Sequence, residues 1–344
     1  MVPFVWSDEC LRHEPGAEIW VGVRTPATEL PERAARIREA LLDAGACEVP
    51  ATAHPDVALL AVHDPALVEF LRTAWEEWSA LGLPSDRVVP YVFAREELTG
   101  GRPAPKPAAV WARPGRFAYD TMTLIGPGTW QAARGAVDVA LTAVDLVADG
   151  APAAYACCRP PGHHVTRSLY GGSCYLNNSA IAAAALLERV GGPVAIVDID
   201  AHHGNGTQEV FRGRDDVRTA SVHVDPGAGW FPHFLGFTDE NDASNVNLPI
   251  APGSGDGPWL AAVRKAAAFA AGARALVIAL GVDAATADPE SPLAVTHDGY
   301  GEAGRILGEL GVPTVVVQEG GYDLGTIGDL AVATLAGVSD TLGV

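Results

Sequence analysis

The chain has 344 residues, of which 48% are hydrophobic, and a formal net charge of −19. This apolar content suffices for a large core and excludes a disordered protein, while the acidic charge disfavours nucleic acid and anionic membranes and favours cationic partners. Five cysteines without a C-x-x-C pair, no signal-peptide pattern and no apolar run long enough to span a bilayer predict a cytoplasmic protein.

Apolar segments alternate with helical patterns along most of the chain. The predicted strands are 153–158, 194–199, 219–224, 275–280 and 312–317, and the helices between them are 179–189, 259–271 and 300–310. This alternation predicts right-handed crossovers and a mostly parallel sheet covered by helices on both faces. We therefore expect a single three-layer α/β/α domain over residues 1–344.

The segment from about 83 to 115 differs in composition from the rest. It is rich in Pro, Gly and Arg and has no clear periodicity, although periodic sequence resumes on both sides. Long ordered loops in compact domains usually serve as lids, binding loops or subunit contacts. We expect this one at the rim of an active site or at a subunit interface.

A polar cluster follows each of the five predicted strands. In open parallel sheets, ligands bind beyond the carboxyl ends of the strands. The five clusters should therefore converge on one cleft. They occupy residues 159–164, 198–207, 223–226, 281–283 and 319–322.

Asp200 and His202 follow the strand at 194–197 and lie two residues apart, so their side chains point to the same side. Together they can bind one divalent cation, with Asp198 one step deeper, and this oxygen and nitrogen set suits zinc. Asp283, after another predicted strand, is the expected third ligand. Three ligands leave positions for water and a substrate oxygen. Helix capping, the alternative for this stretch, explains neither the aspartates nor the histidines.

His163 and His164 follow a Pro-Pro-Gly turn that can hold two imidazoles rigidly. A buried imidazole needs a partner for its second nitrogen, and Asp198 and Asn205 are available for this. A carboxylate partner would keep one histidine more basic than an amide keeps the other, which suits separate electrostatic and proton-transfer roles. Tyr322, after two glycines, can donate a hydrogen bond to a developing oxyanion.

Several segments together resemble the histone deacetylase family, which belongs to the arginase/deacetylase superfamily of zinc amidohydrolases. Residues 223–240 are similar to the bacterial acetylpolyamine amidohydrolase branch in particular. The matching segments are RPPGHH (159–164), GGSCYLNN (171–178), DIDAHHGNGTQ (198–208), SVHVDP (221–226), LGVD (280–283) and EGGYD (319–323).

The resemblance implies catalytic roles for the matching residues. His163 and His164 become the catalytic pair. Asp198 would be the partner of His163 and Asn205 the partner of His164, and Tyr322 would polarise the scissile carbonyl. The zinc ligands become Asp200, His202 and Asp283.

The resemblance also implies a second ion and a substrate tunnel. A structural potassium ion would be bound by side chains and backbone carbonyls, namely those of Asp198 and Ser221 and the carbonyls of Asp200, His202 and Val222. Along the tunnel, Asp120 would anchor the substrate at the rim, the carbonyl of Gly172 would line the passage and Phe231 would form a wall.

Two further positions bear on the substrate. Ser173 stands where the family usually has an aromatic residue, so one side of the tunnel should be wider or more polar. Glu290 follows Asp-Pro at a position where members selective for acetylated polyamines have an acidic gatekeeper. A solvated loop glutamate is the simpler interpretation of Glu290, but an anionic tunnel mouth on an acidic chain fits a linear cationic amine.

The prediction is a zinc-dependent amidohydrolase that removes acetyl or other short acyl groups from small cationic amines, acetylpolyamines above all. A protein acetyl-lysine deacetylase and a tailoring deacetylase of natural-product biosynthesis remain as alternatives. A catalytically silent acyl-ligand-binding protein would lack a zinc ligand or Tyr322, and all of these are present. A ureohydrolase with paired manganese would need more Asp and His ligands. The sequence leaves open a homodimer or a larger homo-oligomer.

Overall fold

A parallel sheet of eight strands forms the centre of residues 1–343, the part of the chain that the computed structural model describes. Its spatial order is β4-β1-β5-β10-β9-β6-β7-β8, and the neighbouring pairs are parallel. β2 and β3 form a separate antiparallel hairpin. The strands are β1 Phe4–Trp6, β2 Glu18–Trp20, β3 Val23–Thr25, β4 Glu48–Pro50, β5 Ala153–Ala156, β6 Val194–Asp198, β7 Val217–Val224, β8 Asn245–Ile250, β9 Ala275–Leu280 and β10 Thr314–Gln318.

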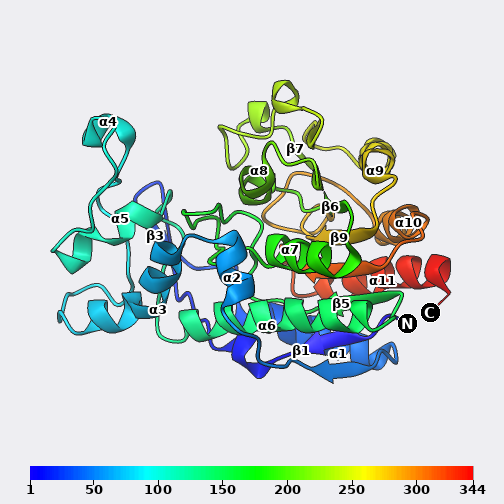
Figure 1. Cartoon of the computed structure of the whole chain (residues 1–344), viewed down its shortest axis with the longest axis horizontal. Coiled ribbons are helices and arrows are strands. Elements are labelled where there is room, and N and C mark those ends of the chain that lie inside the picture. The colour runs from blue at the N-terminus through cyan, green and yellow to red at the C-terminus, as the bar shows by residue number, and fades with distance from the viewer. Residues whose placement is uncertain (344) are drawn as a thin grey trace.

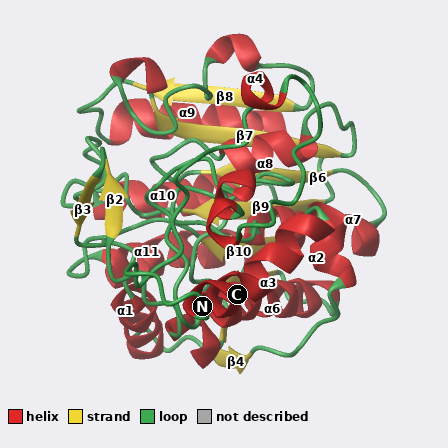
Figure 2. Cartoon of the chain, turned by 90° about the vertical axis from the view of Figure 1, so that its left-hand side faces the viewer, coloured by secondary structure: helices red, strands yellow, loops and turns green. Residues whose placement is uncertain are grey.

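Helices cover both faces of this sheet. Figure 2 shows the strands between α3, α6 and α7 on one side and α1, α10 and α11 on the other. The helices are α1 Pro31–Asp43, α2 Val57–Val62, α3 Pro65–Ser79, α4 Glu96–Thr99, α5 Pro114–Phe117, α6 Thr129–Ala148, α7 Asn178–Val190, α8 Asn205–Phe211, α9 Asp256–Ala270, α10 His297–Gly308 and α11 Ile327–Leu342. Short 3₁₀ turns lie at Asp8–Leu11, Val110–Ala112, Pro226–Ala228 and Thr238–Glu240. None of the helices in the described residues is long and apolar enough to cross a membrane.

Alternating side chains of the central strands fill two separate cores. In β6, Val194 and Ile196 belong to the core shared with α6 and α7, while Ala195 and Val197 belong to the core on the opposite face. Successive side chains of a strand point to opposite faces, so a strand buried on both sides reads as a continuous apolar run. The three-layer fold and the mostly parallel sheet are thereby confirmed.

All five predicted strands are present, although their ends shift by a few residues. β10 begins only at Thr314, after Pro313, which has no N–H to donate to a neighbouring strand. Strands β1, β4 and β8 and helices α6 and α11 are not among the predicted elements. β1 and β4 have three residues each and are too short to show a period.

The segment 83–115 is irregular apart from α4, one 3₁₀ turn and the start of α5. It lies at the left of Figure 1, where α4 projects from the body of the molecule. Large hydrophobic side chains are exposed along it: Tyr91 is 69%, Leu98 66% and Trp111 46% accessible. Isolated exposed hydrophobics are ordinary, but several on one projecting segment are typical of a binding surface.

Candidate active site

The carboxyl ends of β6 and β9 bring the three predicted metal ligands together. The two strands are neighbours in the sheet, and β10 lies on the far side of β9. One ligand atom each from Asp200, His202 and Asp283 lies within 4.8 Å of the other two. Nδ1 of His202 is 3.0 Å from Oδ2 of Asp283 and 3.3 Å from Oδ1 of Asp200. These residues form a candidate metal centre.

The chemistry of this donor set fits a divalent cation. Asp200 and Asp283 have no solvent exposure. Burial and the charge of Asp200 raise the pKa of Asp283 to about 7, because two adjacent buried carboxylates are unfavourable when both are charged. A cation between them removes this repulsion, and two oxygens and one imidazole nitrogen suit zinc. Within the described residues the cluster has three protein ligands, which leaves room for water or substrate.

Backbone groups hold the two carboxylates in place. The N–H of Gly320 donates to Oδ2 of Asp200, and the N–H of Ala201 donates to Oδ1 of Asp283, both at 2.8 Å. A Cβ at Gly320 would collide with Oδ2 of Asp200 and lie 2.5 Å from Oδ2 of Asp283, and one at Gly281 would also collide with Asp200. Glycine is therefore required where β9 and β10 end, because the backbone approaches the carboxylates so closely.

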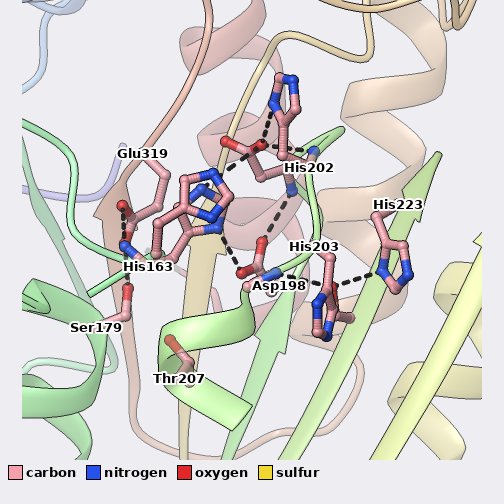
Figure 3. Close-up of polar contacts among 12 residues, drawn as sticks. His163, Ser179, Asp198, His202, His203, Thr207, His223 and Glu319 are labelled. Atoms are coloured by element: carbon pink, nitrogen blue, oxygen red, sulfur yellow. Dashed lines mark hydrogen bonds and ion pairs between the residues drawn. The ribbon is translucent and has the colours of Figure 1, made fainter. Parts of the chain in front are cut away.

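His163 and His164 lie side by side, with ring centroids 4.0 Å apart, but have different partners. Nδ1 of His163 is 2.9 Å from Oδ2 of Asp198 (Figure 3), while Nδ1 of His164 is 2.7 Å from Oδ1 of Asn205. Burial opposes the charged form of His163, but the charges of Asp200 and Asp198 outweigh it and raise its pKa to about 10. Burial, with the charges of His163 and His202, lowers the pKa of His164 well below its usual range. Two adjacent imidazoles are thus held in opposite protonation states.

Tyr322 follows β10 and is fixed by its neighbours. Its N–H donates to Oδ2 of Asp288 at 2.6 Å, and the guanidinium carbon of Arg33 lies 4.6 Å from its ring centroid. Burial raises the pKa of the phenol well above its usual range, so the hydroxyl keeps its proton and is a hydrogen-bond donor. This is the state that a role in polarising a carbonyl requires.

Phe231 and Gly172 both lie against His164. The rings of Phe231 and His164 are nearly perpendicular, at 87°, with centroids 4.9 Å apart. Gly172 has a φ of +59°, and a Cβ there would collide with the His164 ring. Both residues are therefore next to the predicted catalytic imidazole, where tunnel-lining residues are expected.

The carboxylate of Asp120 accepts hydrogen bonds from other groups of the protein. Its Oδ1 accepts hydrogen bonds from the N–H groups of Met122 and Thr123, and its Oδ2 accepts from the N–H of Gly172 at 2.6 Å and from the hydroxyl of Thr123. The carboxylate thus fastens the Gly172 segment. Substrate anchoring by Asp120 stays a prediction.

Glu290 is half-buried and close to the Tyr322 loop. Its N–H donates to Oδ1 of Asp288, whose other oxygen accepts from the N–H of Tyr322. An acidic residue therefore lies near the tyrosine that is predicted to contact the substrate. Its role as a gatekeeper stays a prediction.

Two of the predicted potassium ligands are neighbours. Ser221 in β7 is in register with Asp198 in β6, and both side chains are almost fully buried. Oγ of Ser221 lies 2.8 Å from Nδ1 of His223. The pairing of the two strands brings an aspartate and a serine oxygen ligand to the same level of the sheet.

The sequence model of the histone deacetylase domain matches residues 27–338. The chain belongs to the histone deacetylase family. It is 40% identical over 343 residues to acetylpolyamine amidohydrolase 1 of Pseudomonas aeruginosa, covering 97% of both chains, and 37% identical to acetylpolyamine amidohydrolase of Mycoplana ramosa, covering 97% of this chain and 99% of that one. A crystal structure of acetylpolyamine aminohydrolase from Burkholderia pseudomallei superimposes with a TM-score of 0.91 at 38% identity, covering 99% of each chain.

The sequence places Glu319 in a polar cluster of the site but does not predict its role. Glu319, directly after β10, accepts hydrogen bonds at Oε2 from the N–H groups of Gly162 and His163, at 2.6 and 3.1 Å, and at Oε1 from Ser179 (Figure 3). It thereby fixes the turn that carries the two histidines. Burial raises the pKa of Glu319 to about 7. A carboxylate directly after a buried strand was the available signal.

Arg33, at the start of α1, was also missed. It donates to the backbone carbonyls of Glu319 and Gly321 on either side of Gly320, and its third partner is the buried carboxylate of Glu29. Its two backbone partners lie 286 and 288 residues away in the sequence. The i, i+4 spacing of Glu29 and Arg33 is visible in the sequence, but it indicates only a local ion pair.

Proposed function

We propose that this protein hydrolyses the amide bond of small cationic N-acyl amines, acetylpolyamines in particular. The observation that carries the proposal is a pair of adjacent imidazoles, one backed by a carboxylate and the other by an amide, beside a buried cluster of two aspartates and a histidine. Membership of the histone deacetylase family and the names of the full-length relatives support it.

Asp200, His202 and Asp283 would hold the metal, and their donor atoms favour zinc. A zinc ion in such a site acts as a Lewis acid toward an amide carbonyl and makes water a stronger nucleophile. We also propose that Asp198 and Ser221, with backbone carbonyls of Asp200, His202 and Val222, bind potassium. The register between β6 and β7 supports this second site.

The proton transfers fall to His164. Its Nδ1 faces the carbonyl oxygen of Asn205 and so carries the hydrogen, which leaves Nε2 able to accept a proton. Because its pKa lies well below the usual range, His164 is neutral at pH 7 and serves as the general base. It then returns the proton to the departing amine. His163, whose Nδ1 is 2.9 Å from Oδ2 of Asp198, is the more basic of the two imidazoles and would stabilise negative charge that develops nearby.

Tyr322 completes the arrangement by donating its hydroxyl to the carbonyl oxygen as that oxygen becomes anionic. A donor of this kind contributes about 3–4 kcal/mol to the barrier reduction in comparable sites. Arg33 lies over the Tyr322 ring and Asp288 accepts from its backbone N–H, so both residues restrict the movement of the Tyr322 loop.

The preference for a cationic amine is supported by charge. Glu290 lies near Tyr322, and the chain as a whole carries a net charge of −19, which attracts cations over a long range. A protein acetyl-lysine deacetylase fits the same charge, and Ser173 keeps a tailoring deacetylase open. The relatives of matching length favour the polyamine substrate over both.

The test is a substrate comparison with protein of defined metal content. Acetylputrescine, acetylspermidine, an acetyl-lysine peptide and a longer-chain acyl amine are assayed with zinc-loaded and metal-depleted protein. We expect the acetylated polyamines to have the highest kcat/KM and the metal-depleted protein to be inactive. Equal or higher kcat/KM with the peptide would contradict the proposed substrate, and full activity without metal would contradict the proposed mechanism.

Two properties of the whole protein belong to the same proposal. We assign the exposed segment 83–115 to the rim of the site or to an interface between copies of this chain, supported by the exposure of Tyr91, Leu98 and Trp111. Light scattering of Leu98→Glu against wild type tests the interface, since a charge there should dissociate a dimer. A cytoplasmic location is supported by cysteines that are free throughout the described residues.

A further inference from the structure

The residue before Asp120, Tyr119, contacts the backbone of His164, although no motif singled it out. Tyr119 follows α5, and its N–H donates to the carbonyl of Tyr170 at 3.2 Å, which places it beside the segment that carries Gly171 and Gly172. Its ring lies over Gly171 so closely that a Cβ there would collide with it. Tyr119 is thus packed directly on the segment expected to line the substrate tunnel.

The Tyr119 ring also faces Phe231. The two half-buried residues have nearly parallel rings, at 21°, with centroids 6.4 Å apart. Phe231 in turn stands nearly perpendicular to the His164 ring, so Tyr119 packs against a side chain that borders this imidazole. The two rings together offer apolar surface against which the methylene chain of a linear amine can pack.

This arrangement bears on the unusual serine of the GGSC segment. Ser173 has a φ of +60°, and its N–H donates to the hydroxyl of Thr123. Its small polar side chain supplies no apolar ring. Tyr119 brings an aromatic ring to Gly171, two residues before Ser173, from a different segment of the chain.

The hydroxyl of Tyr119 adds a second contact. It donates to the backbone carbonyl of His164 at 3.2 Å, and burial raises its pKa well above the usual range, so the donor is present at any working pH. The ring position of Tyr119 is therefore tied to the backbone that carries the proposed general base.

We propose that Tyr119 forms an aromatic wall of the substrate tunnel together with Phe231, in place of a ring at position 173, and that its hydroxyl positions His164. The inference rests on the proposed function for its substrate, an N-acyl amine with a linear alkyl chain. It concerns specificity through the ring and positioning through the hydroxyl, and two variants separate these roles.

Tyr119→Leu removes the ring, and Tyr119→Phe removes only the hydroxyl. For Tyr119→Leu we expect a rise in the KM for acetylputrescine of roughly ten-fold, which corresponds to one lost aromatic contact. For Tyr119→Phe we expect an unchanged KM and a kcat lowered several-fold, because His164 is less well held. Phe269→Leu, which removes a partly buried ring from α9, is the matched control and should leave both constants unchanged.

A rescue experiment decides between a wall and a merely structural residue. Adding Ser173→Tyr to Tyr119→Leu should bring the KM back to within about two-fold of wild type, since either ring can face Phe231. Wild-type KM in Tyr119→Leu, or no recovery in the folded double variant, overturns the inference.

Binding of a straight-chain alkyl hydroxamate to the zinc-loaded protein, measured by calorimetry, separates this inference from the proposed function. Should the wild type hydrolyse no acyl amine, the proposed function fails. The wall is then still tested by whether Tyr119→Leu weakens the binding of the hydroxamate about ten-fold. Equal affinity in both proteins contradicts it.

Discussion

The floor of the site and its proposed rim are built in different ways. The floor consists of the residues at the ends of β6, β9 and β10, and its charged side chains are buried and hydrogen-bonded to the backbone. We assign the β2–β3 hairpin, segment 83–115 and residues 226–240 to the rim. Each exposes a large apolar side chain: Trp20 is 61%, Leu98 66% and Phe234 87% accessible. We expect the buried floor to catalyse the reaction and the exposed rim to determine which substrate binds. Substitutions in the floor should therefore reduce the hydrolysis of every substrate, and substitutions near the rim should change their ranking.

The largest effect is expected at Tyr322. Tyr322→Phe keeps the ring against Arg33 but removes the donor, so kcat should fall by about 10²–10³ for all N-acyl amines. Steady-state kinetics with the zinc content measured in parallel checks this. Near-wild-type turnover with the metal bound would show that the hydroxyl has no part in the reaction.

Gly320 tests whether the close backbone approach matters to the metal. In Gly320→Ala the new Cβ meets the carboxylates of Asp200 and Asp283, so zinc affinity should fall by about 10–100-fold. Competition with a chromophoric chelator measures the affinity. Gly325→Ala is the control from the same loop, because its Cβ would lie 3.6 Å from the nearest atom, in Asp323. Equal affinities in the two variants would contradict the prediction.

Glu290 tests the selection of the substrate. Glu290→Leu should lower kcat/KM for acetylputrescine and acetylspermidine roughly ten-fold, the loss expected from one favourable charge contact, with little change for an acetyl-lysine peptide. Glu290→Gln, which keeps the shape, should show the same direction if charge is the cause. Equal losses on all substrates would mean that Glu290 supports the floor and does not select the substrate.

The smallest effect is expected outside both regions, at His63, and it concerns stability near neutral pH. His63 at the end of α2 donates from Nδ1 to the carbonyl of Thr166 and accepts at Nε2 from the N–H of Asn177, so it must be neutral in the folded protein. Burial lowers its pKa from 6.5 to about 4. The stability that neutral His63 contributes to the fold is therefore present above pH 6.5 and is lost as the pH falls toward 4. At pH 6 the free energy of unfolding should already be lower by about 1 kcal/mol.

His63→Gln can make both hydrogen bonds without titrating. Urea denaturation at pH 8 and pH 6 should show a smaller loss of unfolding free energy in this variant than in wild type. His297→Gln, at an exposed position on α10, is the control and should follow wild type. Identical pH profiles of His63→Gln and wild type would assign the acid sensitivity to other groups.

The floor could be predicted from the sequence to a greater extent than its supports. The Asp-x-Asp-x-His spacing at the end of one strand places its side chains by local geometry alone, and the two histidines are adjacent. The roles of Glu319, Arg33 and Tyr119 were missed because their partners lie far along the chain. Glu319 contacts His163 over 156 residues of sequence, and Arg33 contacts Glu319 over 286 residues. Tyr119 contacts His164 over 45 residues.

Asp120 shows the converse. The family motif singles out this residue, but nothing in the local sequence shows which groups its carboxylate contacts. Its bond to Thr123 is local, but its bond to the N–H of Gly172 joins positions 52 residues apart and becomes visible only in three dimensions. A motif can therefore identify a position while leaving open whether the side chain faces the substrate or the protein itself.

The place of β10 in the sheet has a consequence for how the enzyme is made. β10 is the last strand in the chain, yet it lies between β5 and β9. Until residues 314–318 leave the ribosome, the nascent chain can form only two half-sheets with unpaired inner edges, which are prone to aggregate. Gly320 and Tyr322 arrive with that same strand, so the protein becomes able to react only at the moment when its two halves are joined.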